Sequence, residues 1–288
     1  MDAIIMSDFR AAQSRAYDLT VSTSNEEQVI GILLQRGFSA FQELEGNSNQ
    51  TVYRIWTSPT MSLEEMAGWF PNIEMVIAPH HQEDVFQTSQ RRPKSVGGFR
   101  LLSSPQYPLG PYDICLLDGV GFGWGEHPTT TLGLMFLQHF APNGLDQTRC
   151  LDFGAGTGIL SFAATRCGAP SVDAVEVDDA ALYTLKRNIQ VNQLDAHISI
   201  QRELTKCDGQ YDLILANMYM DVLLPSLSSL ARRLRANARL WISGFTIDQR
   251  DEILQEARKL GLTHANTDTH DDWVGMSFIN VSITRESH

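Results

Sequence analysis

An apolar run, a glycine-rich stretch and an alanine-rich run follow one another between residues 149 and 167, and few folds accommodate that succession. The glycine-rich stretch reads D-F-G-A-G-T-G over residues 152–158, so an acidic residue precedes three glycines at alternate positions. Glycine adopts a positive φ without steric cost and lets the backbone approach a ligand closely. The stretch therefore predicts a nucleotide-binding turn between a strand and a helix.

The spacing of these glycines separates two classes of ligand. Dinucleotide-binding turns follow G-x-G-x-x-G, whose third glycine lets the helix pack closely on the strand. Ile159 stands in that third position, which argues against an NAD dehydrogenase. The pattern D-x-G-x-G-x-G resembles instead the first motif of class I S-adenosylmethionine (SAM) methyltransferases. That resemblance implies that Asp152 faces the methionine ammonium group and that Gly154, Gly156 and Gly158 contact the cofactor; a turn that holds no ligand is the alternative.

A second acidic residue supports a ligand that contains ribose. Residues 172–177 form a β-rich run in which Glu176 lies 22 residues after Gly154. A ribose-binding carboxylate is expected at that distance. Asp178 and Asp179 come next and start a helix, so we expect them mainly as N-terminal caps.

Composition and charge limit the class of partner. With 43% hydrophobic residues, the chain can bury a large core and has room for one large and one small domain. Its net charge is −12 and it has no lysine- or arginine-rich block, which argues against binding nucleic acid through phosphate neutralisation. The negative field suits a basic partner better. The oligomeric state is left open.

Cysteine usage and hydropathy point to the cytoplasm. The four cysteines are scattered without a C-x-x-C pair, so they predict buried thiols of a reducing compartment. The N-terminus lacks the pattern of a signal peptide, and no run approaches the roughly 18 apolar residues of a membrane span. His80 and His81 are better explained as a solvated pair than as ligands, and no metal site is expected.

Residues 1–92 are expected to form a small α+β domain. The pattern alternates strand, helix, strand, strand, helix, strand, an order that resembles a ferredoxin-like unit. Capping-box patterns at Ser24 and Ser62 predict two helix starts, and residues 45–49 predict a turn. The polar residues 79–98 predict a linker. The expected elements are strands at 17–22, 38–44, 51–57 and 73–78 and helices at 25–36 and 63–70.

Residues 93–288 are expected to form the larger domain. Strands alternate with helices there, which predicts an α/β fold with a doubly wound parallel sheet. The expected strands are 150–153, 172–177, 198–201, 213–217 and 240–244. After a helix at 248–260, the segments 263–266 and 274–283 predict a final antiparallel pair. Together they predict the Rossmann-like, seven-stranded sheet of class I methyltransferases.

A second glycine-rich segment reads G-F-G-W-G-E-H-P-T-T over residues 121–130 and precedes an apolar helix at 132–140. Folding a loop so rich in glycine costs much conformational entropy, so we expect its backbone to lie against a ligand or another segment. A flexible loop ahead of an ordinary helix start is the alternative.

This second segment looks like the F-G-T-G-x-H-P-T-T signature of the ribosomal protein L11 methyltransferase (PrmA) family. The likeness extends over roughly residues 105–288, whereas the preceding residues match the family only in their ferredoxin-like layout. It continues through D-F-G-A-G-T-G-I-L, the strand end at Glu176, Ala216-Asn217, the stretch from Ser243-Gly244 to Gln249, and Asp272-Trp273-Val274.

The resemblance implies where this chain contacts SAM. The contacts fall on Thr130, Gly154, Glu176 and Asn217, together with Phe122 and Gly123 of the second glycine-rich segment. The family usually has aspartate where Glu176 stands, and the longer side chain can still accept hydrogen bonds from two ribose hydroxyls. Trp124 and Glu126 replace the usual threonines, so the departures concern the protein substrate more than the cofactor.

Asn217 is the expected catalytic residue. It ends a strand at the carboxyl edge of the sheet, where ligands bind in such folds, and its side-chain carbonyl can accept a hydrogen bond from an amine. A helix cap is its alternative role. The family implies methyl transfer from SAM to lysine and N-terminal amines of a ribosomal protein, which the small domain presents. The alternatives are a lysine methyltransferase of another protein, a small-molecule methyltransferase and a SAM-binding scaffold without activity.

Overall fold

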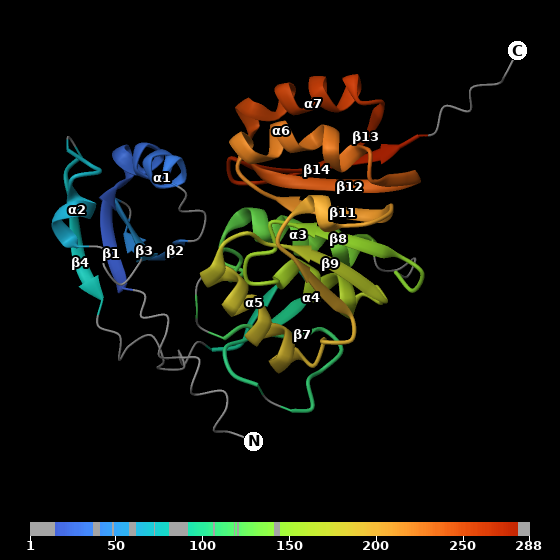
Figure 1. Cartoon of the computed structure of the whole chain (residues 1–288), viewed down its shortest axis with the longest axis horizontal. Coiled ribbons are helices and arrows are strands. Elements are labelled where there is room, and N and C mark those ends of the chain that lie inside the picture. Colours follow the sequence, from blue (N-terminus) through green and yellow to red (C-terminus); the bar gives the residue numbers. More distant parts are fainter. Residues whose placement is uncertain are drawn as a thin grey trace, which may run out of the picture. The chain divides into compact units, whose positions relative to one another are not determined.

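The computed structural model describes residues 15–36, 41–47, 49–57, 62–71, 73–80, 92–105, 107–117, 119, 121–140 and 145–281. These residues belong to two compact units, whose elements are labelled in Figure 1. The first unit contains the described residues before residue 90, and the second contains most of the chain after it. The described residues 119, 121–122 and 178–181 are grouped with the first unit.

The first unit is a four-stranded antiparallel sheet with two helices. Its elements are β1 (Arg15–Ser22), α1 (Glu26–Gln35), β2 (Phe41–Asn47), β3 (Gln50–Thr57), α2 (Leu63–Ala67) and β4 (Met75–His80). The sheet order is β2-β3-β1-β4, and every pair of neighbours is antiparallel, which confirms the ferredoxin-like prediction. Leu19 and Val21 of β1 and Val29 and Leu33 of α1 are fully buried, because both elements turn an apolar face inward.

The helix starts and the turn predicted for this unit are only partly confirmed. The backbone N–H of Glu65 donates to Ser62 Oγ at 3.1 Å, as the second capping pattern predicts. Ser24 instead lies within a 3-10 turn, Thr23–Asn25, and α1 begins only at Glu26. The predicted turn at residues 45–49 is too long, because strand pairing between β2 and β3 continues to Asn47.

The second unit is built on a seven-stranded sheet of order β10-β9-β8-β11-β12-β14-β13. Its strands are β8 (Arg149–Phe153), β9 (Ser171–Val175), β10 (Ile198–Gln201), β11 (Tyr211–Asn217), β12 (Leu234–Thr246), β13 (Leu262–His270) and β14 (Trp273–Asn280). The first five in the sheet are parallel, and β14 runs antiparallel to both of its neighbours. The predicted Rossmann-like sheet with an antiparallel end is therefore confirmed. The strand order reverses between β8 and β11, where ligands bind in such sheets.

Helices cover both faces of this sheet (Figure 1). They are α3 (Pro128–Phe140), α4 (Ile159–Arg166), α5 (Asp179–Asn192), α6 (Met220–Ala231) and α7 (Arg250–Lys259). Successive residues of β11 point to opposite faces: Leu213 packs in the cluster that α3, α4 and α5 cover, and Ile214 in the cluster that α6 and α7 cover. Both strand faces are thus apolar, as a doubly wound sheet requires.

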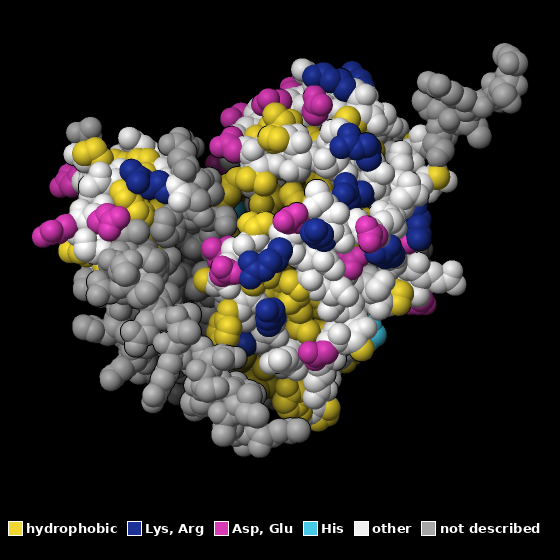
Figure 2. All heavy atoms as spheres, in the orientation of Figure 1, with side chains coloured by type: hydrophobic (Ala, Val, Ile, Leu, Met, Phe, Trp, Pro, Cys, Tyr) yellow, Lys and Arg dark blue, Asp and Glu magenta, His cyan; other side chains and the backbone are white. Residues whose placement is uncertain are grey.

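Charged side chains are distributed over the surface. On the face of the second unit drawn in Figure 2, lysine and arginine side chains lie scattered among acidic ones. None of the helices in the described ranges is both long enough and apolar enough to cross a membrane.

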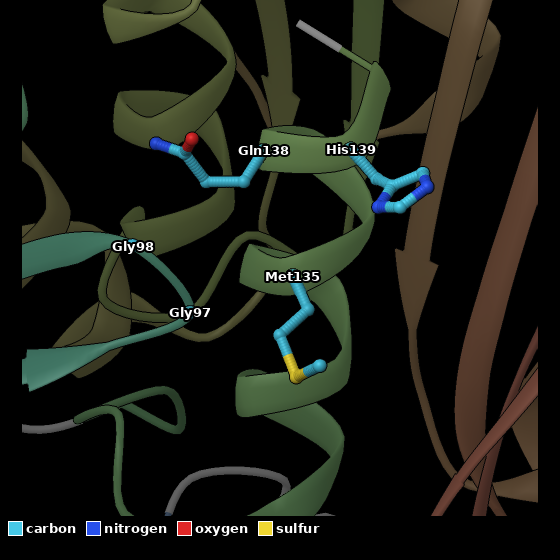
Figure 3. Close-up of a pocket in the computed structure, with 5 residues that line it drawn as sticks. All are labelled: Gly97, Gly98, Met135, Gln138 and His139. Carbon is cyan, nitrogen blue, oxygen red and sulfur yellow. The ribbon is translucent and has the colours of Figure 1, made fainter.

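A three-stranded sheet occupies residues 94–115. Its strands are β5 (Lys94–Val96), β6 (Phe99–Leu102) and β7 (Asp113–Cys115), in the order β5-β6-β7. Gly97 and Gly98 have positive φ and turn β5 back onto β6. A Cβ on Gly97 would lie 2.6 Å from the Cβ of Leu134 in α3, so only glycine allows the turn to lie this close to the helix. Figure 3 shows the turn beside α3.

The linker predicted at residues 79–98 is therefore wrong at both ends. Pro79 and His80 belong to β4, and residues 94–98 form β5 and its turn. The intervening residues 81–91 lie outside the described ranges. A polar segment with paired glycines is typical of a linker and of a tight turn alike, and the contact with α3 is what distinguishes the two.

Candidate functional site

The glycine-rich turn lies between β8 and α4, as predicted. Gly154, Gly156 and Gly158 have φ of +79°, +54° and +89°, a region that favours glycine. The backbone N–H groups of Gly154 and Ala155 donate to the carbonyl of Val175 at 3.0 and 2.9 Å, which ties the turn to the end of β9. The turn thus takes its shape from glycine φ angles and from the neighbouring strand.

Asp152 anchors α4 from beneath the turn. It is 1% exposed, and its Oδ2 accepts hydrogen bonds from the backbone N–H of Ser161 at 3.0 Å and from Ser161 Oγ at 2.7 Å. Burial raises the pKa of the Asp152 carboxyl to about 6. One carboxyl oxygen is therefore committed to the first turn of the helix, which leaves contact with an ammonium group as a prediction.

Glu176 lies directly after β9 and contacts the glycine-rich turn. Its Oε2 accepts from the backbone N–H of Gly156 at 2.9 Å, and its Oε1 accepts from the N–H of Val177 at 2.8 Å. The residue is 8% exposed, whereas the next residue, Val177, is 65% exposed. The carboxylate that is predicted to bind ribose therefore also shapes the turn that is predicted to bind SAM.

Asp178 caps the N-terminus of α5. Its Oδ1 accepts from the backbone N–H of Ala181 at 2.8 Å. This confirms the expectation that Asp178 caps the helix.

The second glycine-rich segment meets the first. Thr157 Oγ1 donates to the carbonyl oxygen of Gly123 at 2.7 Å, and a Cβ on Gly123 would lie 3.1 Å from both Thr157 Oγ1 and Ile159 Cγ2. Gly123 and Gly125 have φ of +104° and +82°. The expectation that this backbone lies against another segment is confirmed, and Phe122 immediately precedes the point of contact.

His127 directly precedes α3 and contacts a residue near the C-terminal end of the sheet. Its Nδ1 accepts from the backbone N–H of Thr129 at 3.3 Å and lies 2.8 Å from Thr129 Oγ1. Its ring contacts the ring of Trp273 edge to face, with centroids 4.6 Å apart. Burial, assisted by His270, lowers the pKa of His127 to about 4, so the imidazole is neutral at physiological pH.

Thr130 lies one turn further along, and its side chain is fully buried. Its Oγ1 has no hydrogen-bond partner within the described residues. Buried hydroxyls normally have a partner, so this one is an unmet hydrogen-bonding group at the end of the second glycine-rich segment.

Asn217 ends β11 beside the glycine-rich turn. In the sheet Ala216 pairs with Phe153 and Asn217 pairs with Ser243, so Asn217 lies at the carboxyl edge between β8 and β12. The next residue, Met218, lies between two glycines: a Cβ on Gly154 would be 1.9 Å from Met218 Sδ. A Cβ on Gly244 would be 2.2 Å from the carbonyl oxygen of Met218. These contacts hold the turn that carries Asn217.

Several site residues were missed by sequence reasoning. Met218 gave no signal, because an apolar residue after a strand is typical of many helix starts. Asn188 and Asn192 did give a sequence signal, because asparagines at i and i+4 on a helix share a face. In the structure these two residues are 0% and 1% exposed. Buried asparagines on one helix face indicate bonds to backbone of another segment.

Comparisons with known proteins agree with this arrangement. A family model described as ribosomal protein L11 methyltransferase (PrmA) matches residues 105–280. The ribosomal protein L11 methyltransferase of Thermotoga neapolitana is 33% identical over 159 residues, which cover 55% of this chain and 59% of that protein. That of Porphyromonas gingivalis is 32% identical over 193 residues, 65% of each chain. The chain thus spans less than two thirds of these relatives.

A solved structure resembles part of this chain. The crystal structure of the ribosomal protein L11 methylase from Lactobacillus delbrueckii subsp. bulgaricus has a TM-score of 0.56 and 25% sequence identity, and the match covers 64% of this chain and 94% of that one. The family match includes both glycine-rich segments, Glu176 and Asn217, which the fold brings to one edge of the sheet. The chain therefore belongs to the ribosomal protein L11 methyltransferase (PrmA) family.

Proposed function

We propose that this chain is a SAM-dependent protein N-methyltransferase that methylates lysine or N-terminal amines of a ribosomal protein similar to L11. The observation that supports it most is the meeting of four segments at one sheet edge. These are the glycine-rich turn, Glu176, the loop that reaches α3 through Gly123, and the turn that carries Asn217. Family membership supports the same activity.

The residues at this edge fit SAM. The unpartnered hydroxyl of Thr130 offers a hydrogen bond. The carboxylate oxygens of Glu176 can accept from ribose hydroxyls, which would replace the N–H of Gly156 as donor. Gly154, Gly156 and Gly158 would hold the cofactor by backbone, with Phe122 and Gly123 beside them. We assign Asp152 an indirect role, because it positions α4 below the turn. When bound, SAM supplies a methyl group activated by its sulfonium.

The substrate amine must be neutral to attack this methyl group. At pH 7 a lysine of pKa about 10.4 costs roughly 4.6 kcal/mol to deprotonate, and an α-amine of pKa about 7.7 costs about 1 kcal/mol. Alignment of the amine supplies much of the remaining rate. The Oδ1 of Asn217 accepts an N–H of the neutral amine and orients its lone pair toward the methyl group, and the proton leaves to water.

His127, Asp152 and the four cysteines are poorly suited to act as a general base. His127 is neutral, but its Nδ1 already accepts from the N–H of Thr129. Asp152 is buried and bonded to Ser161. The thiols of the four cysteines are buried, which raises their pKa values. The site therefore works by binding and aligning an amine that desolvation has already brought to its neutral form.

We assign the two units separate tasks, with residues 1–92 recognising the protein substrate and residues 93–288 transferring the methyl group. Compact units that divide near residue 90 support this boundary. The net charge of −12 and the scattered basic side chains favour a protein partner in the cytoplasm over nucleic acid or a membrane surface (Figure 2). A different lysine-bearing protein is the second candidate, because Trp124 packs into the core and Glu126 is exposed in the loop.

The test is transfer of labelled methyl groups from SAM into purified ribosomal proteins and into a methylation-deficient extract, with labelled bands identified by mass spectrometry. Label in the L11-like protein alone supports the proposal. Label in another protein supports the second candidate. Binding of SAM without any labelled protein would contradict protein methylation. The remaining alternatives would then be a small-molecule methyltransferase or a SAM-binding scaffold.

A further inference from the structure

Two buried side chains hold Leu117 and Gly123, two residues of the chain between β7 and α3. The backbone N–H of Leu117 donates to Asn188 Oδ1 at 2.9 Å. At Gly123, the carbonyl oxygen accepts from Thr157 Oγ1 at 2.7 Å. Leu117 and Gly123 are therefore held by residues of α5 and of the glycine-rich turn.

The two holding residues are bonded to each other. Asn188 Nδ2 donates to the backbone carbonyl of Thr157 at 2.9 Å. Both residues are 0% exposed. Hydrogen bonds in such surroundings have no competing water, and a broken one leaves a buried polar group unsatisfied, so the arrangement is strongly preferred. The three bonds form a continuous connection from α5 through the glycine-rich turn to the second glycine-rich segment.

Asn192 is a second buried asparagine of α5, and its side chain bonds no described residue of the glycine-rich segments. Asn192 lies one helical turn after Asn188 and bonds both the N–H and the carbonyl of Cys115, at 2.9 and 2.7 Å. Its Nδ2 also donates to the backbone carbonyl of Asn188 at 2.7 Å, and none of these bonds reaches a glycine-rich segment. Asn192 is thus a matched reference for the role of Asn188.

We propose that Asn188 and Thr157 are positioning residues that couple the two glycine-rich segments, so that the loop reaching His127 and Thr130 is ordered against the cofactor turn. The inference rests on the proposed function for its kinetic consequences, but not for its structural ones. Neither side chain is expected to touch SAM or the substrate, because the polar atoms of both already bond to the protein backbone, unlike the hydroxyl of Thr130. Their effect passes through the backbone of Gly123 and of the glycine-rich turn.

Two variants remove one bond each. Asn188→Asp keeps the acceptor for Leu117 and replaces the donor to Thr157 by an oxygen. Thr157→Val removes only the hydroxyl that bonds Gly123, and Thr157→Ser restores it. We expect Asn188→Asp and Thr157→Val to weaken SAM binding about fivefold, on the scale of one hydrogen bond, and to lower kcat further, while Thr157→Ser stays within about twofold of wild type.

Two controls remove equivalent bonds elsewhere. Asn192→Asp disturbs the bonds to Cys115 and to the backbone carbonyl of Asn188, and Thr165→Val removes a hydroxyl that donates to the carbonyl of Ser161 at 2.9 Å within α4. Both are expected to lower Tm while leaving the SAM affinity and the kcat of the folded enzyme within about twofold of wild type. Hydrogen exchange at residues 123–127 supplies a readout that needs no activity, and only Asn188→Asp and Thr157→Val are expected to speed it.

The outcomes separate this inference from the proposed function. If the wild type bound no SAM, the proposed function would fail, while faster exchange at residues 123–127 in Thr157→Val would still support the coupling. If Thr157→Val folded with unchanged exchange and unchanged SAM affinity, the coupling would be overturned even in an active enzyme. Thr157→Val carries the test if Asn188→Asp fails to fold.

Discussion

Gly154 and Met218 touch across the carboxyl ends of β8 and β11, where a Cβ on Gly154 would lie 1.9 Å from Met218 Sδ. The first glycine of the turn is thus required by a side chain of the protein as well as by any ligand. Its φ of +79° adds a second requirement, because other residues are strained in that region. Met218 directly follows the candidate catalytic residue Asn217, so its contact with Gly154 connects the turn to that residue.

Gly154→Ala is therefore expected to lower both stability and SAM affinity. The left-handed backbone costs about 1–3 kcal/mol, and the clash with Met218 adds to it. Adding Met218→Ala should recover the part that comes from the clash, so the two changes together cost less than their sum. Thermal unfolding of both single variants and the double variant measures this. Strict additivity would show that the contact has no energetic importance.

Glu176→Gln tests the carboxylate beside the turn. The amide retains one oxygen and loses the charge, so we expect SAM to bind about ten- to a hundredfold more weakly, because bonds to charged groups are the stronger ones. Glu176→Asp, which carries the residue usual in the family, should bind within a few-fold of wild type. Titration calorimetry measures the affinities. Glu256→Gln, at a half-buried position of α7 where the carboxylate pairs with Lys259 at 2.9 Å, is the charge control, and an equal loss there would point to net charge instead of the site.

Asn217→Ala tests the candidate catalytic residue. Removing its side-chain oxygen takes away the acceptor that orients the substrate amine, so kcat should fall about a hundredfold, the scale of a single positioned group. The affinity for SAM should stay within about twofold of wild type. Steady-state kinetics and calorimetry separate the two quantities, with Asn266→Ala on the exposed strand β13 as control. Collapse of SAM affinity with normal turnover at saturation would make Asn217 a cofactor-binding residue only.

The raised pKa of Asp152 predicts that the free energy of unfolding depends on pH. Its pKa rises from 3.8 to about 6 on folding, so the protonated form is favoured in the native state. The stabilisation is fully present below about pH 4 and is lost as the pH rises through 6, by up to about 3 kcal/mol for two pH units. Asp152→Asn removes this titration and keeps an oxygen for Ser161, so its stability relative to wild type should increase between pH 4 and pH 7. Unfolding curves at a series of pH values measure this, and parallel curves for the two proteins would contradict the shift.

Local sequence patterns were sufficient wherever one segment determines its own conformation. Three glycines at alternate positions require a turn with positive φ, and Glu176 follows from the distance along one strand-helix-strand unit. Alternation of strands and helices likewise predicted a parallel, doubly wound sheet. The linker prediction failed for the opposite reason: Gly97 and Gly98 are glycines because α3 lies against them, and that helix is more than 30 residues away.

The sequence by itself determined the two glycine-rich segments, the acidic residue after β9, the ferredoxin-like order of the first unit and the family resemblance, because each depends on residue type and on spacing along the chain. Only the tertiary structure decided that Asp152 bonds Ser161, that Glu176 bonds Gly156, that Met218 lies between Gly154 and Gly244, and that Asn188 joins α5 to the turn. These partners are specified by how strands β8, β9, β11 and β12 lie side by side. Hydrogen bonds and close contacts between distant segments form only after that packing, and no periodicity within a segment encodes them.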